Sequence, residues 1–238
     1  MKYKNTKYTI IYGIDELSGT FLEENIQEFE NLQFLISKGS YTSECRSVIK
    51  TDSLSNWIYI LTGTDPSIHG VIDNKWKRHQ PYVSALPNII IIQTHNNYDK
   101  INVMIYIFQN IFTVIRKNYA SNITLDAYYD WDGIDIILQL KEYLNVSKFY
   151  EANKKEEMVQ EAFDYIAQYK SIIMFIHYDG VDEIGHKYVF GKEYVNEIKI
   201  VDKKIGNLIQ LLKTINIYEE TLILIVSDYG RKESVFSH

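Results

Sequence analysis

Four short runs of apolar residues are typical of β-strands buried inside a sheet. They are rich in β-branched and aromatic side chains and are too short for ordinary helices. The runs are Tyr8–Ile14, Leu125–Tyr129, 171–177 and Thr221–Val226. Weaker runs at 41–48 and 89–92 predict two more strands.

In the segments between these runs, apolar residues recur every three or four positions, which predicts amphipathic helices. Gly39 and Gly63 follow two of these segments and suit helix ends. Polar segments at 131–133 and 178–186 predict a turn and a loop. The predicted helices cover 21–38, 107–117, 134–144, 156–169 and 193–213, with a short one at 57–61.

The alternation of strands and helices predicts an α/β fold, with a mostly parallel sheet covered by helices on both faces. We expect the whole chain, 1–238, to form one such domain. In folds of this kind the functional site lies at the carboxyl ends of the strands. Four candidate residues fall there: Asp15, Asp182, His186 and Asp228.

Composition narrows the classes of function. The chain has 25 Lys and Arg against 31 Asp and Glu, and its net charge of −6 gives no basic surface for nucleic acid. The single cysteine, Cys45, allows neither an internal disulfide nor a cysteine-based zinc site. The N-terminus lacks the apolar stretch of a signal peptide, and the most apolar region, 101–115, is too short and too polar to span a bilayer. The default expectation is a cytoplasmic or otherwise intracellular protein without a membrane segment.

Ser53 and Ser55 precede the short predicted helix, so either is a candidate N-cap. A hydroxyl at this point lies beside free backbone N–H groups and the positive end of the helix dipole, which together suit a phosphate group. Most serines before helices are only caps. The phosphate interpretation gains weight from the acids and the histidine that follow the predicted strands.

Asp182 and His186 are four residues apart, and a carboxylate with an imidazole is a common ligand pair for Zn²⁺, Mn²⁺ or Fe²⁺. Asp15 and Asp228 each follow a buried strand, although a loop carboxylate or helix cap would explain either of them alone. Together the four residues indicate a metal cluster. Two metals about 3.5–4 Å apart would activate a serine and hold the oxygens of an in-line phosphoryl displacement.

The chain resembles the alkaline-phosphatase superfamily, in its type I phosphodiesterase/nucleotide pyrophosphatase branch. The resemblance runs from Ile10 to about Asp228, and its strength lies in several motifs that occur in the same order. The motifs are Thr51-Asp52-Ser53-Leu54-Ser55-Asn56-Trp57, Leu61-Thr62-Gly63 with Pro66 and His69-Gly70-Val71, Asp73-Asn74, Trp131-Asp132-Gly133, Asp182-Glu183-Ile184-Gly185-His186 and Ser227-Asp228.

The resemblance implies a role for each matching residue. Ser53 would be the nucleophile that forms a covalent phosphoryl- or nucleotidyl-enzyme, and Asn56 would bind a non-bridging phosphate oxygen. Two divalent ions, Zn²⁺ by preference, would bind the protein. Asp182 and His186 would hold one ion, and Asp15, Ser53 and Asp228 would hold the other.

The chain departs from the pattern of this branch at several places. Tyr229 stands where a metal-binding histidine is usual, Glu16 replaces a glycine, and Ser55 replaces a proline. His238 is the one candidate for a further histidine ligand of the first metal. The resemblance also implies a later strand and helix that this chain lacks, so we expect a truncated product or a fragment.

The expected function is metal-dependent hydrolysis of phosphodiester or nucleotide pyrophosphate bonds in a small phosphate ester or nucleotide. Asn56-Trp57 favours this activity, whereas Asp52-Ser53 keeps a phosphomonoesterase open. A sulfatase is disfavoured because Trp57 stands where that branch needs an arginine, and a phosphoglycerate mutase is disfavoured by length. A catalytically impaired homologue that acts as a binding protein is the alternative from another class. The oligomeric state is open.

Overall fold

The computed structural model describes residues 6–48, 51–76, 89–96, 99–106, 110–119, 123–138 and 143–230, with backbone alone between 89 and 106. The chain divides into two compact units. The first unit comprises Met1–Arg46, Asn122–Trp131 and Leu144–His238, and the second comprises Ser47–Ser121 and Asp132–Tyr143. That the whole chain forms one domain stays a prediction.

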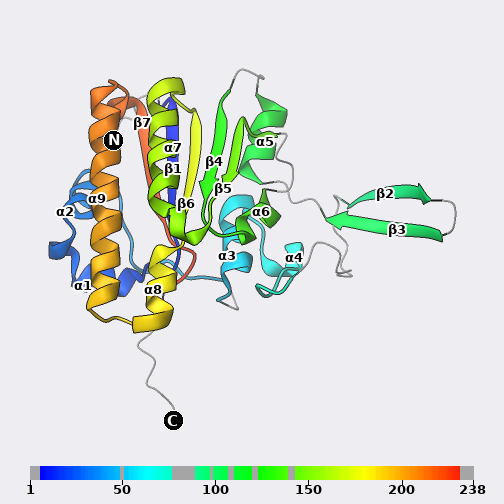
Figure 1. The fold of residues 1–238 in the computed structure, drawn as a ribbon, viewed down its shortest axis with the longest axis horizontal. Helices are drawn as coiled ribbons and strands as arrows, with labels where there is room; N and C mark the ends of the chain where they lie inside the picture. Colours follow the sequence, from blue (N-terminus) through cyan, green and yellow to red (C-terminus); the bar gives the residue numbers. More distant parts are fainter. Residues whose placement is uncertain are drawn as a thin grey trace, which may run out of the picture. The chain divides into compact units, whose positions relative to one another are not determined.

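The first unit contains a five-stranded sheet in the order β5-β4-β6-β1-β7 (Figure 1). Every pairing in it is parallel, as the alternating pattern predicted. The strands are β1 (Tyr8–Ile14), β4 (Leu125–Tyr129), β5 (Val146–Phe149), β6 (Ile173–Tyr178) and β7 (Thr221–Val226). The first and last strands of the chain are therefore neighbours in the sheet.

The inner strands are buried along almost their whole length. Every residue of β4 and β6 is buried, as are the last five of β1, so both faces of these strands are covered. This burial explains why their sequences are continuous apolar runs. Short β5 is exposed at its end and has a polar sequence, which is why the pattern did not predict it.

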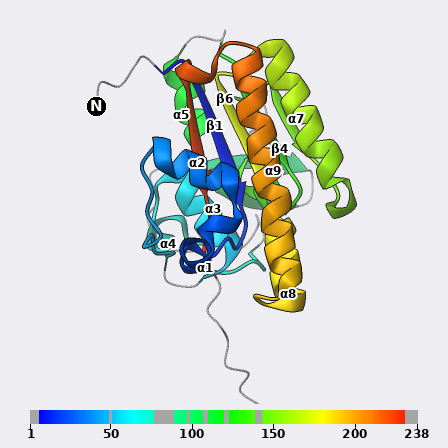
Figure 2. The ribbon, with the colours of Figure 1, turned by 90° about the vertical axis from the view of Figure 1, so that its left-hand side faces the viewer.

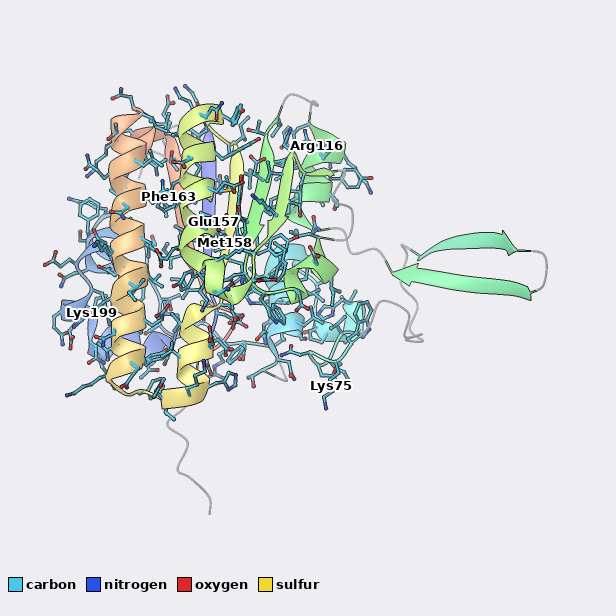
Figure 3. All side chains as sticks on the ribbon, viewed as in Figure 1. Lys75, Arg116, Glu157, Met158, Phe163 and Lys199 are labelled. Atoms are coloured by element: carbon cyan, nitrogen blue, oxygen red, sulfur yellow. The ribbon has the colours of Figure 1, made fainter. Side chains whose placement is uncertain are left out.

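Helices α7 (Lys155–Tyr169) and α9 (Lys192–Thr214) lie side by side on one face of this sheet (Figure 1 and Figure 2). Met158 and Phe163 of α7 belong to the hydrophobic core, whereas Glu157 beside them is exposed (Figure 3). The apolar stripe of α9 is buried in the same core, as the helical spacing predicted.

The single helix predicted over 21–38 is wrong in detail, because the segment breaks into α1 (Gly19–Glu24), a 3₁₀ turn (Ile26–Glu28) and α2 (Glu30–Lys38). Asn25 ends α1, since both its backbone N–H and its side-chain amide donate to the Phe21 carbonyl. The buried carboxylate of Asp202 on α9 then accepts from the backbone N–H groups of Asn31 and Leu32 at the start of α2.

The second unit holds α3 (Ser53–Thr62), α4 (Pro66–His69), α5 (Ile111–Asn118), α6 (Gly133–Ile137) and an antiparallel pair, β2 (Ile89–Asn96) with β3 (Asp99–Tyr106). Gly63 ends α3 with a φ of 66°, the left-handed conformation that glycine adopts without strain. Asn110 begins α5 by accepting from Thr113 N and donating to the Ile137 carbonyl.

The remaining differences are local. Residues 41–48 form a loop instead of the predicted strand, and β3 was not predicted. The helix predicted over 134–144 is only the short α6 before residues 139–142, which lie outside the described part. Two 3₁₀ turns, Ala152–Lys154 and Tyr218–Glu220, precede α7 and β7. Among the described residues, no helix has the length and apolar character needed to cross a bilayer.

Candidate metal centre

Asp15 and Asp228 come from neighbouring strands of the first unit. Asp15 directly follows β1, and Asp228 follows β7 by two residues. Only 1% of Asp15 and 4% of Asp228 is exposed. The carboxyl ends of parallel strands therefore bring two buried acids to one edge of the sheet, as predicted.

The surroundings of Asp228 fit a cation. Its Oδ1 accepts from Glu16 N at 3.1 Å and from Tyr229 N at 2.9 Å. Its Oδ2 is buried without a hydrogen-bond partner among the described residues. Burial and the charge of Asp15 raise the pKa of Asp228 well above its ordinary value. A buried carboxylate oxygen that faces another acid is costly unless a cation balances it, so these residues suit a metal ion.

The carboxyl of Asp179 also lies in the excess of negative charge near Asp15. Burial, with the nearby charge of Asp15, raises the pKa of the Asp179 carboxyl to about 7. Its backbone N–H donates to Asp130 Oδ1 at 2.9 Å. The nearby acids therefore disfavour ionisation of the Asp179 carboxyl.

Asp182 and His186 lie on α8 (Gly180–Tyr188), where a polar loop was predicted. The loop prediction was wrong because 178–186 has few apolar residues, although Val181 and Gly185 are buried. One helical turn brings His186 Nε2 to 3.3 Å from Asp182 Oδ1. The helix thus places the predicted ligand pair on one face.

Glu16 joins this pair. Ligand atoms of Glu16, Asp182 and His186 all lie within 4.8 Å of one another, while 65% of the His186 side chain is exposed. We call Asp15, Glu16, Asp182, His186 and Asp228 the carboxylate site. In the sequence, Glu16 is notable only because it replaces a glycine, and it was not predicted to be a ligand.

His177 on β6 is buried between two acids. Its Nε2 lies 3.2 Å from Asp15 Oδ2, and its Nδ1 lies 3.3 Å from Asp130 Oδ1. Burial alone would lower the pKa of His177, but hydrogen bonds to Asp130 and Asp15 and their charges outweigh it and raise that pKa to about 9. The ring of Trp131 stacks on the His177 ring, with 6.0 Å between the two ring centroids. Asp130 was missed, although it follows β4 as Asp15 follows β1.

Tyr229 spans the carboxylate site. Its backbone N–H donates to Asp228, and its hydroxyl donates to Asp182 Oδ1 at 3.1 Å. The residue was predicted to stand beside the metal of Asp15 and Asp228. Its hydroxyl instead contacts a ligand of the other predicted metal.

Ser53 and Asn56 lie in the second unit, at the start of α3. The N-cap is Asp52, with extended backbone angles, so the expectation that Ser53 or Ser55 caps the helix is wrong. Ser53 is the first helical residue and is buried. Ser55 is turned to the Val71 carbonyl, to which its hydroxyl donates at 2.9 Å.

Asn56 stabilises the loop before the helix. Its Oδ1 accepts from Val48 N at 2.9 Å, and its Nδ2 donates to the Asp52 carbonyl at 3.0 Å. The structure thus brings together Asp15, Asp182, His186 and Asp228, whereas a site that joins Ser53 and Asn56 to them stays a prediction. His238 lies outside the described residues.

The sequence model of the type I phosphodiesterase / nucleotide pyrophosphatase family matches residues 9–237. The chain belongs to this family. The family assignment confirms the resemblance found in the sequence, within the alkaline-phosphatase superfamily. Several relatives carry the names of nucleotide pyrophosphatases and phosphodiesterases.

Two curated relatives are longer than this chain, which matches only part of each. Human ectonucleotide pyrophosphatase/phosphodiesterase family member 1 is 24% identical over 237 residues, which cover 96% of this chain and 24% of the relative. Bovine bis(5'-adenosyl)-triphosphatase ENPP4 is 22% identical over 230 residues, covering 93% of this chain and 47% of the relative. The chain therefore spans between a quarter and a half of these relatives.

Solved structures confirm the fold. Murine ectonucleotide pyrophosphatase/phosphodiesterase 5, an inactive variant in complex with AMP, superimposes with a TM-score of 0.66 at 16% identity. The match covers 94% of this chain and 57% of the solved one. The family member described here therefore shares the α/β fold of that enzyme.

Proposed function

We propose that this chain is a metal-dependent hydrolase of phosphodiester or nucleotide pyrophosphate bonds that acts through a covalent intermediate on Ser53. The observation that carries the proposal is the grouping of Asp15 and Asp228, which follow β1 and β7, with Asp182 and His186 of α8 in a member of the type I phosphodiesterase family. Tyr229 links the two pairs, because its backbone N–H contacts Asp228 and its hydroxyl contacts Asp182.

The donor set suits two divalent ions. Asp182 and His186 would hold one, and Asp15 and Asp228, with Ser53, would hold the other. Carboxylate oxygen and imidazole nitrogen are common ligands of Zn²⁺ and Mn²⁺. The buried Oδ2 of Asp228, which has no hydrogen-bond partner within the described part of the chain, is the kind of atom that a cation would satisfy. When bound, such ions polarise phosphoryl oxygens and lower the pKa of a coordinated hydroxyl.

The protein's own groups would orient the reaction. Ser53, at the first position of α3, would attack phosphorus from beside the helix N-terminus, where the dipole favours an anion. The bond from phosphorus to the leaving alcohol or phosphate would break as this bond forms, and water would then hydrolyse the phosphoryl-serine to regenerate Ser53. Asn56 would donate its amide to a phosphate oxygen, exchanging the bond that it now makes to Asp52. His177 would hold the Asp15 carboxylate in one orientation, since Asp130 fixes its other ring nitrogen.

The substrate is proposed to be a nucleotide or another small phosphodiester. Support comes from the bis(5'-adenosyl)-triphosphatase among the relatives and from AMP in the structural neighbour. Comparing p-nitrophenyl thymidine monophosphate with p-nitrophenyl phosphate, each with Zn²⁺ or Mn²⁺, tests this choice. We expect faster hydrolysis of the diester, and faster monoester hydrolysis would favour a phosphomonoesterase.

Replacing Ser53 tests the mechanism. Ser53→Ala is expected to abolish turnover and to prevent phosphoryl or nucleotidyl labelling of the protein, as measured by intact mass after an acid quench. Ser55→Ala is the matched control because its hydroxyl is bonded to the Val71 carbonyl. It should keep the label and lose some stability. Wild-type turnover in Ser53→Ala would rule out Ser53 as nucleophile.

A catalytically impaired homologue that binds phosphate compounds is the second candidate function. The hydroxyl of Tyr229 on Asp182 favours it, because a phenol at this point adds no neutral nitrogen ligand. Elemental analysis of the purified chain separates the two candidates. About two ions per chain supports the hydrolase, and none would argue against it.

A further inference from the structure

We infer that Glu16 is the third protein ligand of the metal ion that Asp182 and His186 hold. The inference rests on the proposed function for the presence of that ion, and it adds a ligand to the pair that the sequence identified. Glu16 is the residue of the carboxylate site for which sequence reasoning found no role.

The backbone of Glu16 is fixed on two sides. Its N–H donates to Asp228 Oδ1 at 3.1 Å, and its carbonyl accepts from the Tyr194 hydroxyl at 2.9 Å. Its φ is 56°, a conformation that few residues with a side chain adopt without cost. These contacts hold a carboxylate-bearing residue where glycine would be relaxed.

The side chain is directed at α8, the helix that carries Asp182 and His186. A Cβ atom built at Gly185 of that helix would lie 2.7 Å from Glu16 Oε2. Glycine at this position therefore leaves the space that the carboxylate takes. Only 3% of Glu16 is exposed, so the carboxylate is held inside the fold and away from bulk water.

The donors fit one ion. Two carboxylates and one imidazole offer atoms within 4.8 Å of one another, and three protein ligands with an open fourth position are typical of catalytic zinc sites. Two lysines described near Asp182, Lys155 and Lys187, both pair with Glu183. The side chain of Glu183 thus takes up the nearby positive charge.

The consequence is that consecutive residues serve two ions. Asp15 would hold one ion and Glu16 the other, both from the end of β1. The ion of Asp182 and His186 would not depend on a histidine from later in the chain, since Glu16 would complete its protein ligands.

Metal titration tests this role without measuring activity. Isothermal titration of the metal-free chain with Zn²⁺, and absorption spectroscopy with Co²⁺, would be compared for wild type, Glu16→Gln, Glu16→Gly and the exposed control Glu24→Gln. We expect at least a tenfold loss of affinity at one of two sites in both Glu16 variants, with altered Co²⁺ bands. Glu24→Gln should match wild type.

Thermal unfolding of the metal-free chains separates ligation from a structural role. Glu16→Gly should melt at the wild-type temperature or above, because glycine relaxes a φ of 56°. A lower melting temperature in both variants, with unchanged Zn²⁺ affinity, would make Glu16 structural and overturn the inference.

The outcomes also distinguish this inference from the proposed function. If wild type binds two ions and the Glu16 variants bind both with wild-type affinity, the inference fails while the hydrolase proposal stands. If the variants lose one ion but wild type hydrolyses no phosphoester, the ligand stands and the hydrolase proposal fails. Absence of any ion in wild type would overturn both.

Discussion

The hydroxyl of Tyr229 donates a hydrogen bond to Oδ1 of Asp182 across 3.1 Å. The backbone N–H of the same tyrosine donates to Asp228 Oδ1 at 2.9 Å. One residue thus connects a predicted ligand of each metal. Its hydroxyl occupies Oδ1 of Asp182, so its effect extends to both predicted metal sites.

We expect that replacing Tyr229 by histidine strengthens metal binding at the carboxylate site, where residue 229 contacts both Asp182 and Asp228. A phenol must lose a proton of pKa near 10 before it coordinates, whereas imidazole offers a neutral nitrogen at pH 7. We expect Tyr229→His to bind Zn²⁺ about tenfold more tightly at one of the two sites, which corresponds to about 1.4 kcal/mol. Titration of activity and of binding against Zn²⁺ would measure this.

Tyr229→Phe is the control for that experiment, because it removes the hydroxyl without adding a ligand. It should not gain the affinity of the histidine variant. Overlapping Zn²⁺ curves for wild type and Tyr229→His would mean that residue 229 faces neither ion, and that the second site has been placed wrongly.

The buried carboxylate of Asp202 is expected to be important for stability. It accepts three hydrogen bonds: from the backbone N–H groups of Asn31 and Leu32 and from the Asn31 amide. Asp202→Asn removes the charge and an acceptor, so we expect a loss of about 1–3 kcal/mol in the free energy of unfolding. Urea unfolding would measure it, with exposed Glu157→Gln as a control that changes charge equally and should stay near wild type.

His69 is expected to make the protein sensitive to acid. Burial lowers the pKa of His69 to about 4, and its Nδ1 accepts from Val71 N at 3.1 Å. In the unfolded chain its pKa would be about 6.5, so between pH 6.5 and 4 only the unfolded state binds this proton. Stability from this residue is therefore complete above pH 6.5 and falls as the pH drops towards 4.

His69→Asn tests this, because its side-chain oxygen can accept the Val71 N–H while it takes up no proton. We expect its unfolding free energy to fall less between pH 6.5 and 4, by about 1–2 kcal/mol after allowance for solvent screening. Parallel curves for the two proteins in chemical denaturation at several pH values would contradict the assignment.

The stability cost of burying Asp15 and Asp130 is expected to depend on His177, which lies between them. Removing one member of a buried ionic group leaves the others uncompensated, so His177→Ala should cost about 3–5 kcal/mol of unfolding free energy. Asp130→Asn in the same background should then cost less than in wild type, because its partner is already gone. Equal costs in the two backgrounds would show that Asp130 and His177 are not coupled.

Much of the fold was predictable, because burial leaves a direct mark on sequence. The limits of β1, β4 and β7 match the apolar runs. The prediction that β7 is buried is wrong, because β7 is an edge strand and none of its residues is buried. Segments whose conformation depends on distant contacts were not predictable. The break before α2 depends on Asp202 far along the chain, and exposed β5 carries no apolar run.

Most of the acidic residues of the candidate site could be predicted from the sequence, but their neighbours and hydrogen-bond partners could not. Asp15 and Asp228 follow strong strands, and Asp182 with His186 has the spacing of one helical turn. Only the structure shows that Glu16 and Asp130 lie beside the other acids, because a single carboxylate after a strand has no distinguishing sequence pattern. The N-cap of α3 was misassigned because Asp52 and Ser53 are both good caps in sequence, and only backbone angles decide between them.

The position of β1 between β6 and β7 also constrains the order in which the protein can mature. Thr9 pairs with Ile173 on one side and with Leu222 on the other, so β1 cannot complete its pairings until β7 has been synthesised. On the ribosome, Asp15 emerges long before Asp228 is synthesised. Pairings of such long sequence separation form slowly. A metal ion at Asp15 and Asp228 would therefore bind only after the sheet is complete. It would stabilise the folded chain, and the nascent chain would fold without it.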